Sequence, residues 1–184
     1  MESILRAILV LTSPTGKEID RVDENIARLA ESKAVSSVLV SALNALLDSP
    51  QSGDQDIVAE IFFIMSGLCK VPNQARELFR VGGHRAITSA LVQFMEDDAV
   101  VDHGCMVVRK MSSKSKMIGS IFVQVGICGV LVDALKRHGG VAVLAGSIGG
   151  AMRVLSAAEK ADALFVQAGA CEPLVEALAR PLFH

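Results

Sequence analysis

The sequence predicts an all-α array of stacked helical repeats, and two observations lead to this fold class. The first is a block that occurs three times: LFRVGGHRAITSAL from Leu78, FVQVGICGVLVDAL from Phe122 and FVQAGACEPLVEAL from Phe165. The glycine that the blocks share recurs at intervals of 44 and 43 residues, at Gly82, Gly126 and Gly169. The second is composition, with 51% hydrophobic side chains, five prolines and no Tyr or Trp. A fixed period with aliphatic, helix-forming residues is typical of units that bury their apolar faces against their neighbours.

Each unit is predicted to contain three helices, and the middle unit shows them most clearly. Its helices are expected at residues 73–80, 84–94 and about 100–112. A glycine at Gly82 or Gly83 lets the backbone turn between the first two without a Cβ penalty. Within the third helix, Gly104, Val108 and Met111 are spaced i, i+4 and i+7, which places them on one buried stripe.

The units on either side repeat this scheme with one insertion. The following unit is expected to have helices at 116–125, 128–136 and 141–157. In the preceding unit, Ala34 takes the place of Gly82 but lies 48 residues ahead of it. The turn-rich loop 47–56 absorbs the extra length, and Asp56 is expected to cap the helix that follows. A charged, turn-rich stretch from 13 to 25 precedes this unit.

We expect residues 1–184 to form one repeat domain with an incomplete unit at each end. The complete units span about 21–72, 73–113 and 114–157, and the partial units span 1–13 and 158–184. The first partial unit has the pattern of a third helix, whereas the last ends after a second helix. Terminal repeats usually carry a polar outer face, which these lack. Either the chain is a segment of a longer protein, or self-association or a partner covers the uncapped end helices.

The pattern of a short helix, a glycine, an apolar second helix and a third helix resembles the armadillo repeat family over nearly the whole chain. The third helices read IFFIMSGL from Ile61, GCMVVRKM from Gly104 and IGGAMRVL from Ile148. The resemblance implies a right-handed α-α superhelix of about three repeats, an armadillo-like solenoid. HEAT repeats, which stack helical pairs of similar length, are the nearest alternative.

The resemblance also implies a binding surface, a concave groove lined by third helices that holds an extended peptide. In the family an Asn on each third helix holds the peptide backbone, often with a Trp one turn earlier. Here the Asn position falls on Gly67, Lys110 and Val154, and the Trp position on Phe63, Met106 and Gly150. Because the amide ladder and the aromatic slots are missing, an importin-like receptor for basic peptides is not expected.

Basic residues cluster on or just after the third helices, so a groove with an apolar floor and a basic rim would suit an acidic, partly apolar peptide or helix. The predicted contact residues are Phe63, Met106, Arg109, Lys110, Arg153 and Val154. The competing explanation is that cations near helix C-termini simply complement the helix dipole and stay solvated.

The sequence therefore predicts a protein–protein interaction scaffold with no catalysis, cofactor or metal. The alternative function is a small-molecule or lipid carrier that uses an inter-helix cavity near the glycine-rich third helix, around Gly146 to Gly150. That glycine-rich stretch lacks the Gly-Lys-Ser/Thr ending of a phosphate loop, and its small residues are expected to let helices approach closely. Asp97, Asp98 and Asp102 precede a helix, and we interpret them as capping charges rather than an acid–base pair.

Charge, cysteines and hydropathy exclude further classes. A formal net charge of −2 gives no reason to expect nucleic acid. The four cysteines form no Cys-x-x-Cys pair, and Cys69, Cys105 and Cys128 fall on apolar stripes, which favours a reducing cytoplasmic or nuclear location. The apolar run from 117 to 132 is shorter than a membrane span and matches two charged blocks in the repeat register. We therefore expect no membrane span.

Overall fold

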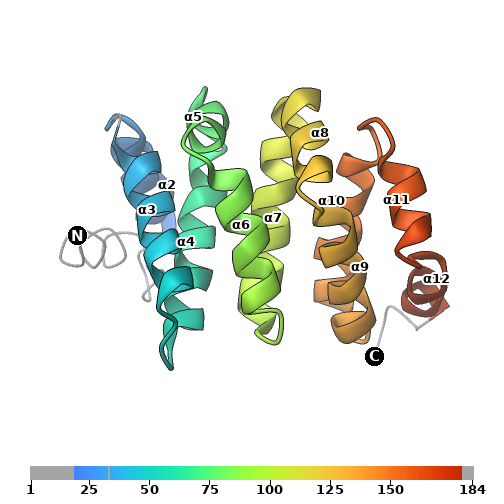
Figure 1. Cartoon of the computed structure of the whole chain (residues 1–184). Helices are drawn as coiled ribbons and strands as arrows, with labels where there is room; N and C mark the ends of the chain where they lie inside the picture. Colours follow the sequence, from blue (N-terminus) through green and yellow to red (C-terminus); the bar gives the residue numbers. More distant parts are fainter. Residues whose placement is uncertain (1–18, 33, 180–184) are drawn as a thin grey trace.

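A computed structural model describes residues 19–32 and 34–179, and every regular element in these ranges is an α-helix. The elements form a right-handed superhelix of the armadillo-like solenoid type (Figure 1). The first unit contains α2 (Ile19–Ala30), α3 (Val35–Asp48) and α4 (Asp54–Leu68). The second contains α5 (Gln74–Arg80), α6 (Gly83–Gln93) and α7 (Asp98–Lys114). The third contains α8 (Lys116–Gln124), α9 (Ile127–His138) and α10 (Ala142–Leu155), and α11 (Ala161–Gln167) and α12 (Cys171–Ala179) follow.

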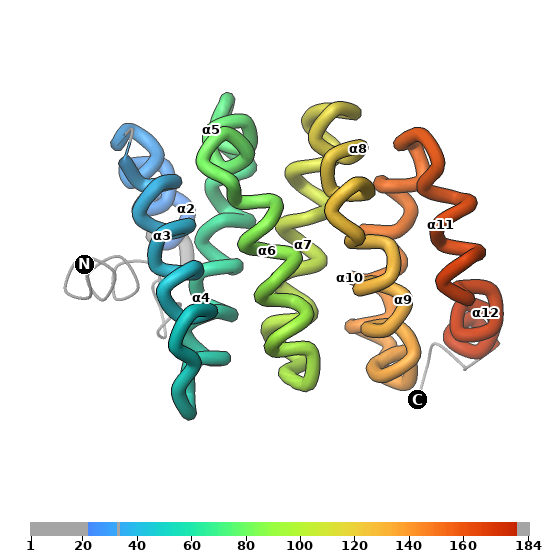
Figure 2. Tube along the Cα trace, viewed as in Figure 1, coloured from blue at the N-terminus to red at the C-terminus, as the bar shows by residue number. Residues whose placement is uncertain are grey.

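The units stack so that equivalent helices lie beside one another. The third helices α4, α7 and α10 contact in sequence, and so do the second helices α3, α6, α9 and α12. In Figure 2 the second-helix row lies in front of the third-helix row, and the short first helices α5 and α8 lie at one end of their units. The predicted N-terminal partial unit, 1–13, lies outside the described residues.

The glycine that defines the repeat is needed for the turn between first and second helices. Gly82, Gly126 and Gly169 have φ values of 87°, 90° and 83°. This left-handed conformation is costly for any residue with a Cβ. The prediction that these glycines end the first helix is confirmed, and the predicted stripe of Gly104 and Met111 is buried as expected.

Two expectations in the first unit were wrong. Residues 13–25 were expected to be a turn-rich connection, but α2 begins at Ile19 because Val22 and Ile26 supply an apolar stripe that is buried. Asp56 was expected to cap α4, but the helix begins earlier, after Gly53 with φ 96°. The carboxylate of Asp54 accepts a hydrogen bond from the backbone N–H of Gln51 at 2.6 Å, which fixes the preceding turn.

The three aspartates near the start of α7 have three different roles. Asp97 is the N-cap, and its side chain accepts from the N–H of Val100 at 2.9 Å, as predicted. Asp98 contacts the Nδ1 of His138 at 2.9 Å and so joins α7 to α9. Asp102 accepts a hydrogen bond from the hydroxyl of Ser147 on α10, so its assignment as a capping charge was wrong.

Replacing Asp97 by alanine should therefore destabilise the protein. The N–H of Val100 would lose its acceptor while the rest of α7 stays in place. We expect a loss of about 1 kcal/mol in the free energy of unfolding, measured by urea denaturation. Asp97→Asn should restore most of it, because an asparagine side chain is also a good N-cap. Equal losses for both variants would contradict the capping role.

A histidine occupies the junction between the second and third units. The ring of His84 lies 4.8 Å from that of Phe79 and 6.3 Å from that of Phe122, and its Nδ1 is buried without a hydrogen-bond partner. Burial lowers the pKa of His84 below its ordinary 6.5, and the nearby charge of Arg85 lowers it further. The neutral imidazole is therefore the form that the fold favours.

This environment predicts a pH-dependent stability. Because the folded pKa is below the unfolded value, the contribution of His84 is complete above about pH 6.5 and declines as the pH falls below it. The melting temperature of the native protein should accordingly decrease on acidification. The melting temperature of the His84→Phe variant should decrease less over the same pH range. Parallel melting curves for the two proteins from neutral to mildly acidic pH would contradict this assignment.

In the part of the chain that the structure describes, no single helix has the length and apolarity to cross a membrane. The pair α8 and α9 would reach that length together, but the two helices meet at 77°.

Candidate functional site

The candidate site is the third-helix face, formed by α4, α7 and α10, on which all six predicted contact residues lie. Phe63 belongs to α4, Met106, Arg109 and Lys110 to α7, and Arg153 and Val154 to α10. Arg153 is exposed, and the other five are half-buried. Half-burial suits side chains that pack along the array while leaving part of their surface open to a partner.

The apolar part of the face centres on Phe63 and Met106, which occupy equivalent positions in consecutive units. The ring of Phe63 lies 5.6 Å from the imidazole of His103, at an angle of 53°. The Nδ1 of His103 is 3.1 Å from the carbonyl oxygen of Ala59, so its ring is fixed by the preceding third helix. Phe63 is thus held in place rather than loosely exposed, as a binding anchor requires.

Arg109 reaches across from α7 to α10. A Cβ added to Gly150 would come within 3.2 Å of its Nη1 and 3.4 Å of its Cδ, so a larger residue at this position would require the arginine side chain to shift by a few tenths of an ångström. The side chain is therefore extended along the third-helix face, with its charge at the boundary between two units. An arginine in this posture can present several N–H donors to a carboxylate.

Lys110 takes part in the structure of the array itself. Its Nζ donates to the carbonyl oxygen of Ser66 at 3.1 Å and to the Ser66 hydroxyl at 3.4 Å. Partial burial lowers the pKa of Lys110, and the nearby charges of Lys70 and Arg109 lower it further. Lys110 thus links α4 to α7, and its ammonium group retains only part of its capacity to bind a partner.

Arg153 differs from Lys110, because it makes no hydrogen bond or ion pair to any described residue. It occupies the position of Arg109 one unit later and is exposed at the end of α10. Beside it, Val154 occupies the position of Lys110, so the lysine contact is not repeated between α7 and α10. Among the predicted cations, Arg153 is the one most available to an acidic group on a partner.

The third-helix face is acidic near the start of α4 and basic near the helix C-termini. Asp56 and Glu60 are exposed in the first half of α4, and Lys70 follows its end and pairs with Asp23 at 2.8 Å. The basic side chains at the ends of the third helices are Lys70, Arg109, Lys110, Lys114 and Arg153. This division would orient a partner segment that carries its own charge asymmetry.

Sequence reasoning missed two polar contacts that join the third helices at equivalent positions. His103 contacts the backbone of Ala59, and one unit later Ser147 donates to Asp102. The pairs are separated by 44 and 45 residues. This separation is about one repeat period, so the repeat register was the signal that could have found them.

The glycine-rich helix α10 is more open than its sequence suggested. A Cβ built on Gly146 or Gly149 meets nothing within 4 Å, so the expectation of close helix approach was wrong at these two positions. They instead line a cavity of about 250 Å³, together with Leu174 and Leu178 of α12. Of the three glycines in this stretch, Gly150 alone is in tight contact, with Arg109.

Comparisons with solved structures agree with this architecture. A designed armadillo repeat protein in complex with the peptide (KR)4 is similar over 97% of this chain and 76% of its own, with a TM-score of 0.63 and 15% identity. A second designed armadillo repeat protein is similar over 94% of this chain and 73% of its own, with a TM-score of 0.61 and 14% identity. No protein-family model matches the sequence. No curated protein matches it either. At this level of identity the similarity establishes the armadillo-like fold.

Proposed function

We propose that the protein is a non-catalytic scaffold whose third-helix face binds an extended or helical segment of a partner protein. The observation that carries the proposal is the arrangement of Phe63, Met106 and Arg153, two apolar anchors and an uncompensated cation on adjacent third helices. Apolar side chains supply most of the binding free energy of such surfaces, and cations select the partner. The similar designed protein holds a peptide, which supports peptide binding as a general role for this architecture.

The chemistry of the face favours a partner that is acidic and partly apolar. The designed neighbour is in complex with a basic peptide, but the basic helix ends here would repel such a segment. A partner with one or two bulky apolar residues and several carboxylates would complement Met106 and Arg153. The mixed apolar and cationic surface therefore sets the partner class that we propose.

The state of the cysteines supports both a role without catalysis and the proposed location. Burial raises the pKa of the Cys69 and Cys105 thiols to about 12, so neither provides a thiolate near neutral pH. All four cysteines are free thiols and three are buried, which supports a reducing cytoplasmic or nuclear location.

The experiment is a selection of displayed peptides on the immobilised protein. Random peptides would be selected for binding, and the enriched sequences would be counted for carboxylates and bulky apolar residues. Enrichment of acidic, apolar-containing peptides whose affinity falls with rising salt is the expected result. Enrichment of basic peptides, or of peptides that bind a Met106→Glu, Arg153→Glu variant equally well, would contradict the proposal.

A carrier function remains the second candidate, because the cavity beside Gly146 and Gly149 lies where it was predicted. Its volume of about 250 Å³ is below the range of about 300–1,000 Å³ that is usual for ligand pockets. A lipid tail would also need an apolar channel longer than this cavity. We therefore favour the scaffold.

A further inference from the structure

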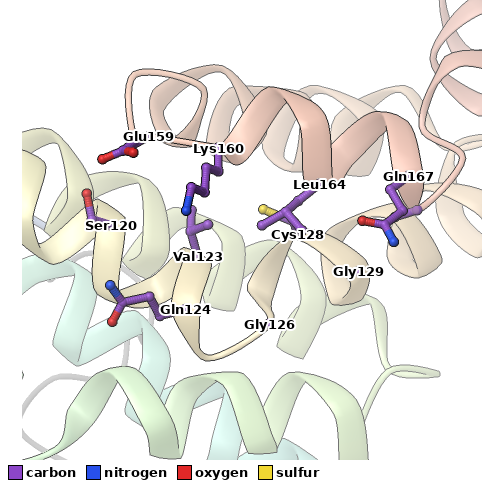
Figure 3. Close-up of a pocket in the computed structure, with 11 residues that line it drawn as sticks. Ser120, Val123, Gln124, Gly126, Cys128, Gly129, Glu159, Lys160, Leu164 and Gln167 are labelled. Atoms are coloured by element: carbon purple, nitrogen blue, oxygen red, sulfur yellow. The ribbon is translucent and has the colours of Figure 1, made fainter.

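A second cavity lies away from the third-helix face, between α8, α9 and α11. It has a volume of about 650 Å³ (Figure 3). Val123 and Cys128, both buried, and the half-buried Leu164 form its apolar wall. Polar side chains surround this wall, and in Figure 3 the sulfur of Cys128 lies close to Leu164, with Gln167 on one side and Lys160 on the other.

The repeat register explains why this cavity exists. At the junction one unit earlier, five of the equivalent positions carry larger side chains. Val123, Cys128 and Gly129 stand where the second unit has Phe79, His84 and Arg85, and Ser120 and Gln124 stand where it has Arg76 and Arg80. A Cβ built on Gly129 meets nothing within 4 Å, so the lost volume has not been refilled by neighbouring atoms.

The earlier junction also shows what shape of group fits. There the imidazole of His84 is tilted by 31° against the ring of Phe79, with centroids 4.8 Å apart, and meets Phe122 edge-on. The space between a first helix and the following unit thus accommodates planar rings. In the third unit the backbone framework is the same, but the chain provides neither ring.

The apolar wall carries no charge, whereas the rim offers amide groups and two charged side chains. Burial raises the pKa of the Cys128 thiol to about 11, so this side chain stays neutral. The amides of Gln124 and Gln167 line the cavity and make no hydrogen bond to a described residue, and both are exposed at its rim. They can therefore bind the polar edge of a ring whose faces contact Val123 and Leu164.

We propose that this cavity binds a small molecule that has a planar aromatic ring with a hydrogen-bonding group on its edge. A volume of 650 Å³ is within the usual range for small-molecule sites, and it exceeds what one aromatic side chain of a partner would fill. The site is formed by first and second helices, so it is independent of the scaffold function proposed for the third-helix face.

The test is an NMR titration of the full chain with indole, which has an aromatic ring and an edge N–H. Cyclohexanol is the comparison, because it has similar size and a hydroxyl group but no planar ring. Indole should give saturable shifts confined to α8, α9 and α11, and should bind about fivefold more tightly than cyclohexanol. Equal binding of the two probes, or no saturable indole shifts in these helices, would overturn the proposal.

Two matched glycine variants locate the binding. Gly129→Arg places the second unit's residue in the cavity and should weaken indole binding by about tenfold or more. Gly146→Arg makes the same change at an open helical glycine of α10 and should leave indole binding unchanged. The reverse pattern would assign binding to the smaller cavity and overturn the proposal. Val123→Phe, which restores another side chain of the second unit, repeats the test if Gly129→Arg loses helical circular dichroism.

Discussion

Replacing Phe62 by alanine is expected to lower the free energy of unfolding by about 3–5 kcal/mol. Its side chain is fully buried on α4 and packs across the junction onto α7. A Cβ added to Gly104 would come within 2.9 Å of the Phe62 ring, so the ring fills the space that this glycine leaves. Removing the ring would create a cavity between two units. This cavity cannot close, because a rigid helix lies on either side of it.

The neighbouring phenylalanine provides the control. Phe63 is on the same helix but only half-buried, at the third-helix face. Phe63→Ala should therefore cost less than half as much, measured by urea denaturation under the same conditions. If the two variants lose equal stability, the packing of α4 against α7 is not as described.

Reversing the character of the third-helix face should have the largest effect on binding. We expect the Met106→Glu, Arg153→Glu variant to bind a selected acidic peptide about tenfold more weakly or worse. The first change removes an apolar anchor, and the second turns an attractive charge into a repulsive one. Isothermal titration calorimetry would measure the dissociation constants. Lys110 is left unchanged, because its contacts with Ser66 would confound binding with stability.

A variant with the same chemical changes elsewhere separates a local effect from a general one. Met117→Glu with Arg85→Glu alters one exposed methionine and one exposed arginine on α8 and α6, with the same change in net charge. This variant should bind the peptide within about twofold of the native protein. Comparable losses in both variants would show that net charge, and not the third-helix face, controls affinity.

The repeat fixed most of the fold in advance, because its register constrains both local and long-range structure. The shared glycine at Gly82, Gly126 and Gly169 indicated the turn between a first and a second helix. The hydrogen bonds that join Gln74 to Ala30, His103 to Ala59, Lys110 to Ser66 and Ser147 to Asp102 span 44 or 45 residues, about one period. The helix α2 was missed in part because its stretch is rich in charged residues, and only the tertiary burial of Val22 and Ile26 overrides that signal.

The candidate site was predictable in position but not in the state of each side chain. The register placed Phe63, Met106 and Arg153 on third helices. It could not show that Lys110 is engaged with Ser66, because that contact depends on the rotamer of a long side chain and on a backbone carbonyl in the neighbouring unit. The contact of Arg109 with Gly150 depends on the crossing of two helices.

The cavity beside Cys128 illustrates a signal that was present and not used. Aligned by the glycine, the third unit has smaller side chains than the second at several positions of one junction. A single small residue can be compensated by a neighbour, so no one substitution was informative. Together they leave a volume that repacking has not filled.

The most direct test of the scaffold proposal is oxidative footprinting of methionine with and without a selected acidic peptide. Met106 lies on the third-helix face, and Met117, 59% exposed on α8, is an internal reference away from it. We expect bound peptide to slow sulfoxide formation at Met106 and to leave Met117 unchanged, as measured by mass spectrometry. Protection of Met117 with no protection of Met106 would place the partner elsewhere and contradict the proposed function.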